Sequence, residues 1–157
     1  MLSQTQDSKG FTLIELIIVI AIIVIVAGIL VSPFSAFRRN QILKAETENV
    51  LSLINKARSQ TLASKNDSNY GVYFTATSVV LFPGNTYDPN NQNNEVVDLN
   101  EAVTIETIDL LGSVDEVVFN RLIGTVSATG TITLTLVSDQ TKSKQIIIKA
   151  TGLASIE

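Results

Sequence analysis

Hydrophobic residues are concentrated in one long run near the N-terminus. No charged residue occurs from Leu16 to Phe37, and Leu16 to Val31 contains only aliphatic residues, alanine and one glycine. A helix needs about 20 apolar residues to cross the hydrocarbon core of a bilayer. The run reaches that length when Phe11 to Ile14 is counted with it. We therefore expect one transmembrane segment followed by an external part.

The helical pattern continues after the apolar run. Leu43, Val50, Ile54 and Ala57 recur at three, four or seven residues, with charged residues between them. This is the period of an amphipathic helix that packs one face. Pro33 lies inside the predicted helix, where it removes one backbone hydrogen bond and is expected to produce a kink. The pattern predicts a helix from residue 11 to about residue 63.

The remainder of the chain has the pattern of short β-strands. The polar segment Ser64–Asn69 ends the helix. After it, apolar and polar residues alternate as in half-buried strands, with glycine-containing turns between them. The predicted strands are 70–74, 78–82, 96–99, 103–111, 117–123, 131–137, 145–150 and 153–156. The fold class is α+β, a long N-terminal helix, half of it transmembrane, packed on a small antiparallel β-sheet or sandwich.

The amino-acid composition excludes several kinds of catalytic and metal-binding site. The 157 residues include no histidine and no cysteine, which excludes histidine acid–base pairs, thiol nucleophiles and Cys/His zinc sites. The net charge of −4 argues against an extended phosphate-binding surface. No nucleophile-elbow, phosphate-loop or SxxK pattern stands out. We expect no enzymatic activity and no cofactor.

Two simpler interpretations of the apolar run were weighed. A secretory signal peptide has a shorter apolar region of about 7–15 residues behind a basic start, whereas here the run is longer and Asp7 offsets Lys9. A plain membrane anchor leaves Glu15 unexplained. A carboxylate one turn into an apolar span is costly and usually has a partner, so it is a functional hypothesis by default.

The residues around Glu15 carry a family resemblance. The segment Lys9–Leu16 (KGFTLIEL) resembles the class III leader of type IV pilins and pseudopilins, with glycine before phenylalanine and glutamate at the fifth position after the glycine. The resemblance implies that a membrane prepilin peptidase cuts between Gly10 and Phe11 and N-methylates the new terminal Phe11. It also implies residues 1–10 as leader, 11–37 as transmembrane and filament-core helix, 38–64 as its amphipathic continuation and 65–157 as an external β-rich domain.

The same resemblance gives Glu15 a role. Cleavage would create an α-amine at Phe11 with a pKa near 7.7–8.0, and its positive charge opposes the helix macrodipole. Glu15 can neutralise this charge within one subunit or from a neighbour and so set the register of assembly. The leader places the N-terminus in the cytoplasm, although Arg38 and Arg39 at the far end of the run would suggest the opposite by the positive-inside rule.

A narrower resemblance concerns the rest of the chain. Residues 57–62 (ARSQTL), 118–124 (VFNRLIG) and 146–156 with Gly152 are similar to the GspH/FimT group of minor pilins and pseudopilins. That group often has arginine directly after the glycine of the last turn, where this chain has Leu153. The resemblance favours a minor subunit.

Nucleic-acid binding and a metal site were considered for the external part. Arg121, Lys142, Lys144 and Lys149 are its only basic residues after Lys65, and four scattered charges make DNA an improbable partner.

The loop at 88–95 contains oxygen donors of the kind that Ca²⁺ prefers. Its carboxylates, Asp88 and Glu95, are weak candidate ligands, because Asn and Pro are also what an exposed turn uses. We expect no metal.

Two hypotheses on function follow. The first is a structural subunit of a type IV pilus or of a type II secretion or competence pseudopilus. Its partners would be the prepilin peptidase/methyltransferase, other pilin subunits, an inner-membrane assembly platform and membrane lipid. It would reside as a single-pass protein in the cytoplasmic membrane with its C-terminal domain outside, and then in a periplasmic or surface filament. The second is a membrane-tethered monomeric binding domain, for DNA or adhesion, that does not polymerise.

Overall fold

The computed structural model describes residues 10–112 and 114–157, and within the helix the side chains of residues 29–33 are not described. The predicted leader, residues 1–10, therefore lies outside the described residues except for Gly10. The chain divides into two compact units, Met1–Arg38 and Arg39–Glu157. Helix α1 (Leu13–Leu62) runs from the first unit into the second.

Helix α1 begins with a side-chain cap. The Thr12 carbonyl accepts a hydrogen bond from the Leu16 N–H at 3.2 Å, and the Thr12 hydroxyl oxygen accepts one from the Glu15 N–H at 3.3 Å. Thr12 is thus the N-cap residue, and it satisfies one of the N–H groups that a helix start leaves free. The helix begins two residues later than Phe11, because the cap residue itself is not helical.

The first unit contains no described secondary structure other than α1. The backbone remains helical through residues 29–33, and the predicted kink at Pro33 stays a prediction. The large apolar side chains described between Leu13 and Val26 are all exposed. The helix is apolar around its whole circumference, as expected of a helix that is buried by lipid or by other chains.

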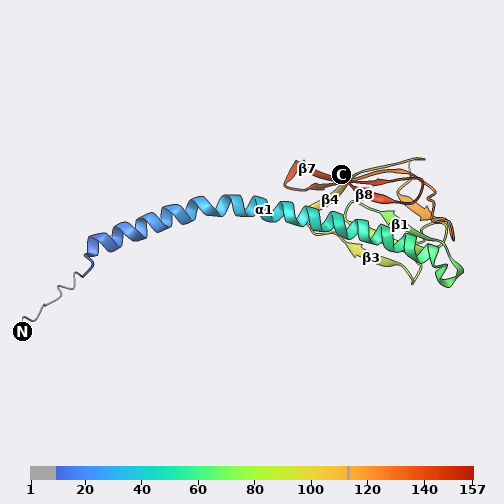
Figure 1. The fold of residues 1–157 in the computed structure, drawn as a ribbon, viewed down its shortest axis with the longest axis horizontal. Coiled ribbons are helices and arrows are strands. Elements are labelled where there is room, and N and C mark those ends of the chain that lie inside the picture. Colours follow the sequence, from blue (N-terminus) through green and yellow to red (C-terminus); the bar gives the residue numbers. More distant parts are fainter. Residues whose placement is uncertain (1–9, 113) are drawn as a thin grey trace, which may run out of the picture. The chain divides into compact units, whose positions relative to one another are not determined.

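The second unit is built from the remainder of α1 and two antiparallel four-stranded sheets (Figure 1). One sheet has the order β3-β2-β1-β5 and the other β4-β6-β7-β8. The strands are β1 (Tyr70–Phe74), β2 (Ser78–Pro83), β3 (Glu95–Asp98), β4 (Val103–Leu110), β5 (Glu116–Phe119), β6 (Gly130–Leu136), β7 (Asp139–Ile148) and β8 (Ala154–Ile156). Buried side chains of α1 and of both sheets form one hydrophobic core, so the α+β prediction is confirmed.

The packed face of α1 carries both apolar residues and threonines. Leu43, Val50, Ile54 and Ala57, the residues predicted for this face, are all buried. Thr61 is also fully buried, and its hydroxyl donates to the Ala57 carbonyl and accepts from the Tyr70 N–H. This buried polar group is therefore satisfied, and it ties the last turn of α1 to the start of β1.

The end of α1 is set by backbone conformation. Ser64, Asn66 and Asp67 have positive φ angles of 50°, 53° and 51°, which a continuing right-handed helix does not allow. A short 3-10 helix, η1 (Lys65–Asp67), follows. The predicted polar terminator is confirmed, and the chain enters β1 directly afterwards.

Two predicted strands differ in extent from the observed ones. The strand predicted over 117–123 ends at Phe119, because the Asn120 carbonyl accepts from the N–H groups of Ile123 and Gly124 and closes a turn. The strand predicted over 145–150 begins six residues earlier, at Asp139. Its first half is polar and is held by pairing with β6, which the local sequence pattern does not reveal.

Gly152 provides a test of the packing of the C-terminal turn. It has a φ of +76°, and a Cβ at this position would overlap the carbonyl oxygen of Gly124. Gly112 also has a positive φ, +98°, but its Cβ would meet nothing within 4 Å. We expect Gly112→Ala to cost about 1 kcal/mol through backbone strain.

We expect Gly152→Ala to cost more than about 3 kcal/mol, because overpacking adds to that strain. All three tyrosines lie in the second unit, so urea unfolding of the full chain in detergent, followed by tyrosine fluorescence, measures both variants. Equal losses would show that the crowding at Gly152 has no energetic effect.

The Thr12 cap provides a second test. Thr12→Val keeps the shape of the side chain and removes the acceptor, whereas Thr12→Ser retains it. Loss of an N-cap costs about 1 kcal/mol, so the Glu15 amide is expected to exchange about fivefold faster in Thr12→Val. Amide exchange by NMR in micelles measures this, and unchanged exchange in the valine variant would contradict the capping role.

Candidate processing and assembly site

The junction between Gly10 and Phe11 lies in an open, non-helical segment. Both residues precede α1, and both are exposed, with Phe11 86% accessible. A Cβ on Gly10 would meet no atom within 4 Å. A protease that binds its substrate in extended form can therefore reach this peptide bond without unwinding the helix.

Glu15 lies one turn inside α1, at the third helical position. Its N–H is bound by the Thr12 hydroxyl, and its side chain is exposed. Its carboxylate makes no hydrogen bond or ion pair with any described residue. A carboxylate in the first turn is favoured by the partial positive charge of the helix N-terminus. The structure thus presents a charged group, stabilised by its own helix, that has no partner within the described part of the chain.

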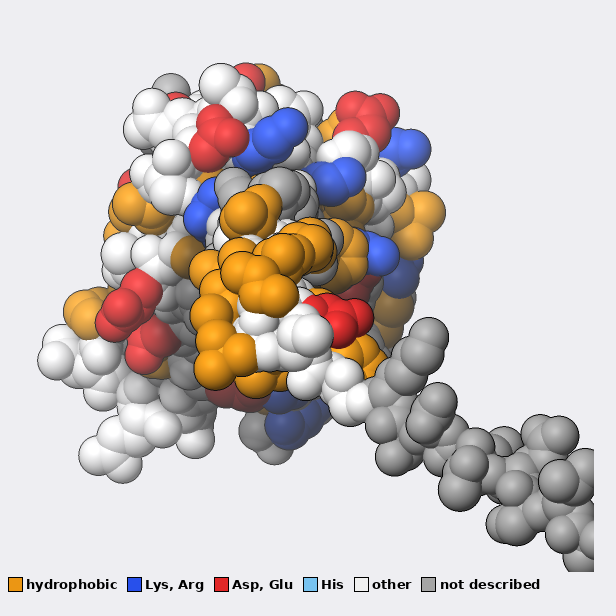
Figure 2. Space-filling model, turned by 90° about the vertical axis from the view of Figure 1, so that its left-hand side faces the viewer, with side chains coloured by type: hydrophobic (Ala, Val, Ile, Leu, Met, Phe, Trp, Pro, Cys, Tyr) orange, Lys and Arg blue, Asp and Glu red, His pale blue; other side chains and the backbone are white. Residues whose placement is uncertain are grey.

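An apolar surface surrounds this carboxylate. In Figure 2, hydrophobic side chains cover most of the described end of α1 that faces the viewer, with an acidic side chain among them. Leu13, Ile14 and Leu16 are 76%, 61% and 57% exposed. Exposed apolar surface of this extent marks a site of contact with another protein or with lipid.

Among the residues that the structure describes, no helix is both long enough and apolar enough to cross a membrane.

The two weak metal candidates make other contacts. The Asp88 carboxylate accepts from the Asn90 N–H at 2.9 Å, as in an ordinary Asx turn. Both oxygens of Glu95 lie 2.6 Å from the Lys56 ammonium. Across the described ranges, no three acidic side chains gather as a metal site would require.

The four basic residues of the external part are less scattered than the sequence suggests. Arg121 binds the carbonyl and the carboxylate of Asp67. Lys142 and Lys144 line the same small cavity beside α1. The sequence pattern missed this grouping, because both lysines lie in the polar first half of β7, which is outside the predicted strands.

Sequence reasoning also missed Thr12. The signal was present, because Thr12-Leu13-Ile14-Glu15 has the S/T-x-x-E spacing of a capping box ahead of an apolar run. Thr12 places Glu15 at a defined position of the first turn and is therefore a positioning residue for the candidate assembly site.

Comparison with known proteins agrees with this geometry at both ends of the chain. Residues 5–31 match the prokaryotic N-terminal methylation motif. No curated protein matches the chain by sequence.

The fold is similar to that of the type IV minor pilin FimU of Pseudomonas aeruginosa (strain PAO1) in two crystal forms. In the P21 form the TM-score is 0.59 at 13% identity, over 77% of this chain and 92% of that one. In the P65 form the TM-score is 0.55 at 13% identity, over 73% and 92%.

The prepilin motif implies processing by a peptidase and assembly with other pilins. The chain thus carries an N-terminal segment that matches the methylation motif and a fold similar to that of a type IV minor pilin.

Proposed function

We propose that the chain is a minor structural subunit of a type IV pilus or of a related secretion or competence pseudopilus. The observation that carries the proposal is the arrangement at the N-terminus. An exposed Gly10–Phe11 bond stands directly ahead of a capped helix that is apolar on all sides, and Glu15 is the only acidic residue in its first turn. The similarity to a minor pilin fold supports the subunit class.

Cleavage would create a positively charged amine at Phe11, and this amine can serve as the ion-pair partner that Glu15 lacks. The new Phe11 amine is largely protonated at neutral pH and lies beside the N-cap, where the helix dipole repels it. A carboxylate at the third helical position can reach back toward the helix start. Glu15 therefore neutralises the amine of its own chain or of a neighbouring subunit, and N-methylation leaves that charge in place.

Assembly then follows from the apolar surface. Before assembly, the uncharged run Leu16–Phe37 is held in the cytoplasmic membrane, with the second unit outside. In the filament, helices of neighbouring subunits replace lipid around the run. A subunit out of register leaves both the amine and the carboxylate unpaired in apolar surroundings, which costs several kcal/mol, so the pair selects the correct register.

The competing function is a membrane-tethered monomeric binding domain. It shares the apolar run but requires neither the cleavage junction nor a partner for Glu15. The unpaired Glu15 carboxylate favours the subunit, and cross-linking of the processed chain separates the two functions.

Processing is tested on the mature N-terminus. In cells with an active prepilin peptidase, mass spectrometry is expected to find a chain that begins with N-methyl-Phe11. Gly10→Val is expected to retain Met1 as the first residue, because the added branch fills a narrow protease cleft. Gly28→Val is the matched control, since neither glycine has an atom within 4 Å of an added Cβ. An uncut wild-type chain, in cells that process another prepilin, would exclude the proposal.

Assembly is tested at Glu15. Glu15→Gln keeps the size of the side chain and removes the charge. It is expected to be processed normally and to enter filaments at least about tenfold less, since about 1.4 kcal/mol of lost register energy suffices for that factor. Glu48→Gln is the control on the same helix, because Glu48 makes only an exposed ion pair with Lys44 at 3.9 Å. Immunolabelling of purified filaments measures both, and equal incorporation would show that Glu15 does not act in assembly.

A further inference from the structure

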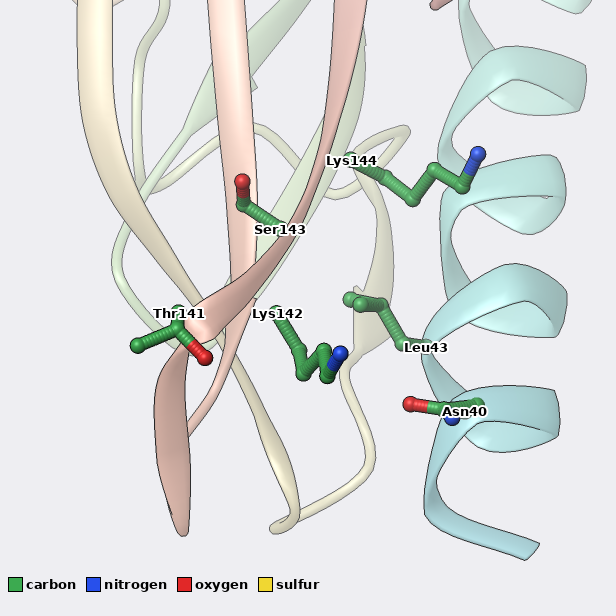
Figure 3. Close-up of a pocket in the computed structure, with 6 residues that line it drawn as sticks. All are labelled: Asn40, Leu43, Thr141, Lys142, Ser143 and Lys144. Carbon is green, nitrogen blue, oxygen red and sulfur yellow. The ribbon is translucent and has the colours of Figure 1, made fainter. Parts of the chain in front are cut away.

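The face of β7 that packs toward α1 changes its chemistry along the strand. Ile146 and Ile148 on this face are buried in the core. Lys144 continues the same face, because side chains alternate with a period of two. Lys142 lies just before it, where the register with β6 shifts. Figure 3 shows both lysines pointing toward α1, while Thr141 and Ser143 point away from it. The face of β7 that packs toward α1 therefore carries buried isoleucines at one end of the strand and two lysines at the other.

A small open cavity lies where the stripe becomes basic. It has a volume of about 220 Å³ and is lined by Asn40 and Leu43 of α1 and by residues 141–144 of β7. Leu43 forms its buried apolar floor, whereas Asn40 and both lysines are exposed. Such a cavity offers ammonium and amide donors at its rim and apolar contact beneath, which suits an anion attached to an apolar body.

The two lysines at this cavity have no ion-pair partner among the described residues. Lys56, Arg121 and Lys44 are each paired with a carboxylate. Among the described ion pairs, none involves Arg39, Lys142 or Lys144. In a chain of net charge −4, these unpaired cations form a local positive surface.

An acidic residue, Asp139, begins β7 and interacts electrostatically with Lys142 and Arg39. The Asp139 carboxylate accepts from both the hydroxyl and the N–H of Thr141, at 2.6 and 3.1 Å. These hydrogen bonds lower the pKa of Asp139, and the positive charges of Lys142 and Arg39 add to the effect. Asp139 thus hydrogen-bonds to Thr141, and none of the described ion pairs joins it to either lysine.

In the sequence, the two helix residues that line the cavity follow shortly after the apolar run. Phe37 is the last residue of the uncharged run, and Asn40 and Leu43 follow it within two helical turns. If the run occupies the hydrocarbon core, the next two turns of the helix lie at the depth of the lipid headgroups. Basic side chains at that depth are attracted to anionic phospholipids.

We propose that Lys142 and Lys144 form a contact site for the phosphate headgroups of anionic phospholipids at the cavity between α1 and β7. The inference rests on the membrane placement proposed above and deepens it by naming the lipid class. Before assembly, the site holds the β6–β7 hairpin against the membrane surface. Entry into a filament releases the headgroups.

The test uses the full chain in nanodiscs of phosphatidylcholine alone, or mixed with an equal part of phosphatidylglycerol. Amide exchange of the segment 137–145 is the readout. Exchange of the wild type is expected to be about fivefold slower, or more, in the discs with phosphatidylglycerol, the factor expected for one basic side chain near an anionic surface. The double variant Lys142→Gln/Lys144→Gln is expected to lose this difference.

Lys149→Gln is the matched control, because Lys149 is an exposed lysine just beyond the same strand, outside the cavity. It is expected to retain the full difference. Inorganic phosphate added to the phosphatidylcholine discs separates a free anion from a headgroup, and equal slowing by phosphate would overturn the lipid site.

The remaining outcomes distinguish this inference from the proposed function. A chain that enters the discs but shows no effect of phosphatidylglycerol overturns the lipid site alone. A chain that enters no disc overturns both. The lysines lie on a part of β7 that β8 does not pair, where charges also prevent edge-to-edge association. Self-association of the double variant, without any lipid dependence in the wild type, would assign them to that role instead.

Discussion

A helix that is apolar around its whole circumference cannot be buried by the chain that carries it, and the first part of α1 is such a helix. All of its described large apolar side chains from Leu13 to Val26 are exposed. Exposed apolar surface costs about 25 cal/mol per Å², so this segment requires a cover supplied from outside. The membrane and a bundle of identical helices both provide one. This requirement explains the proposed roles of the Gly10–Phe11 junction, of Glu15 and of the basic residues of the second unit.

The second unit buries its apolar side chains in a core of its own. From Leu43 onward α1 buries only one face, and the two sheets enclose that face in a single core. The buried threonines of α1, Thr47 and Thr61, bond to their own helix or to β1. The same backbone element thus serves two environments. The two parts of α1 differ only in their side-chain pattern. The first part is apolar on all sides, and the second part is apolar on one side.

The sequence predicts most of this arrangement because its signals are local. The apolar run, the period of Leu43 to Ala57 and the polar terminator after Leu62 each depend on neighbouring residues. The prediction fails where pairing partners are distant. The first half of β7 is a strand because β6 lies beside it, and β5 stops at Phe119 because a turn at Asn120 competes for the backbone. The grouping of Lys142 with Lys144 follows from that pairing, so the sequence alone gave two scattered charges. The roles of Gly10, Phe11 and Glu15 are predicted from a contiguous motif and stay predictions, whereas the capping role of Thr12 was overlooked although its spacing was readable.

The order of cleavage and assembly follows from the electrostatics of the first turn. In the uncut chain Glu15 is stabilised by the helix dipole and by solvent, and it has no positive partner among the described residues. Transfer of an unpaired carboxylate into an apolar filament core would cost several kcal/mol. On the proposed function, cleavage at Gly10–Phe11 would remove that cost by creating an amine one turn away, so that the two groups would enter the core as a neutral pair. On the proposed function, the peptidase therefore does more than remove a leader. It supplies the counter-charge that makes burial of Glu15 possible, and an uncut subunit is excluded from the filament by the same carboxylate that aligns a processed one.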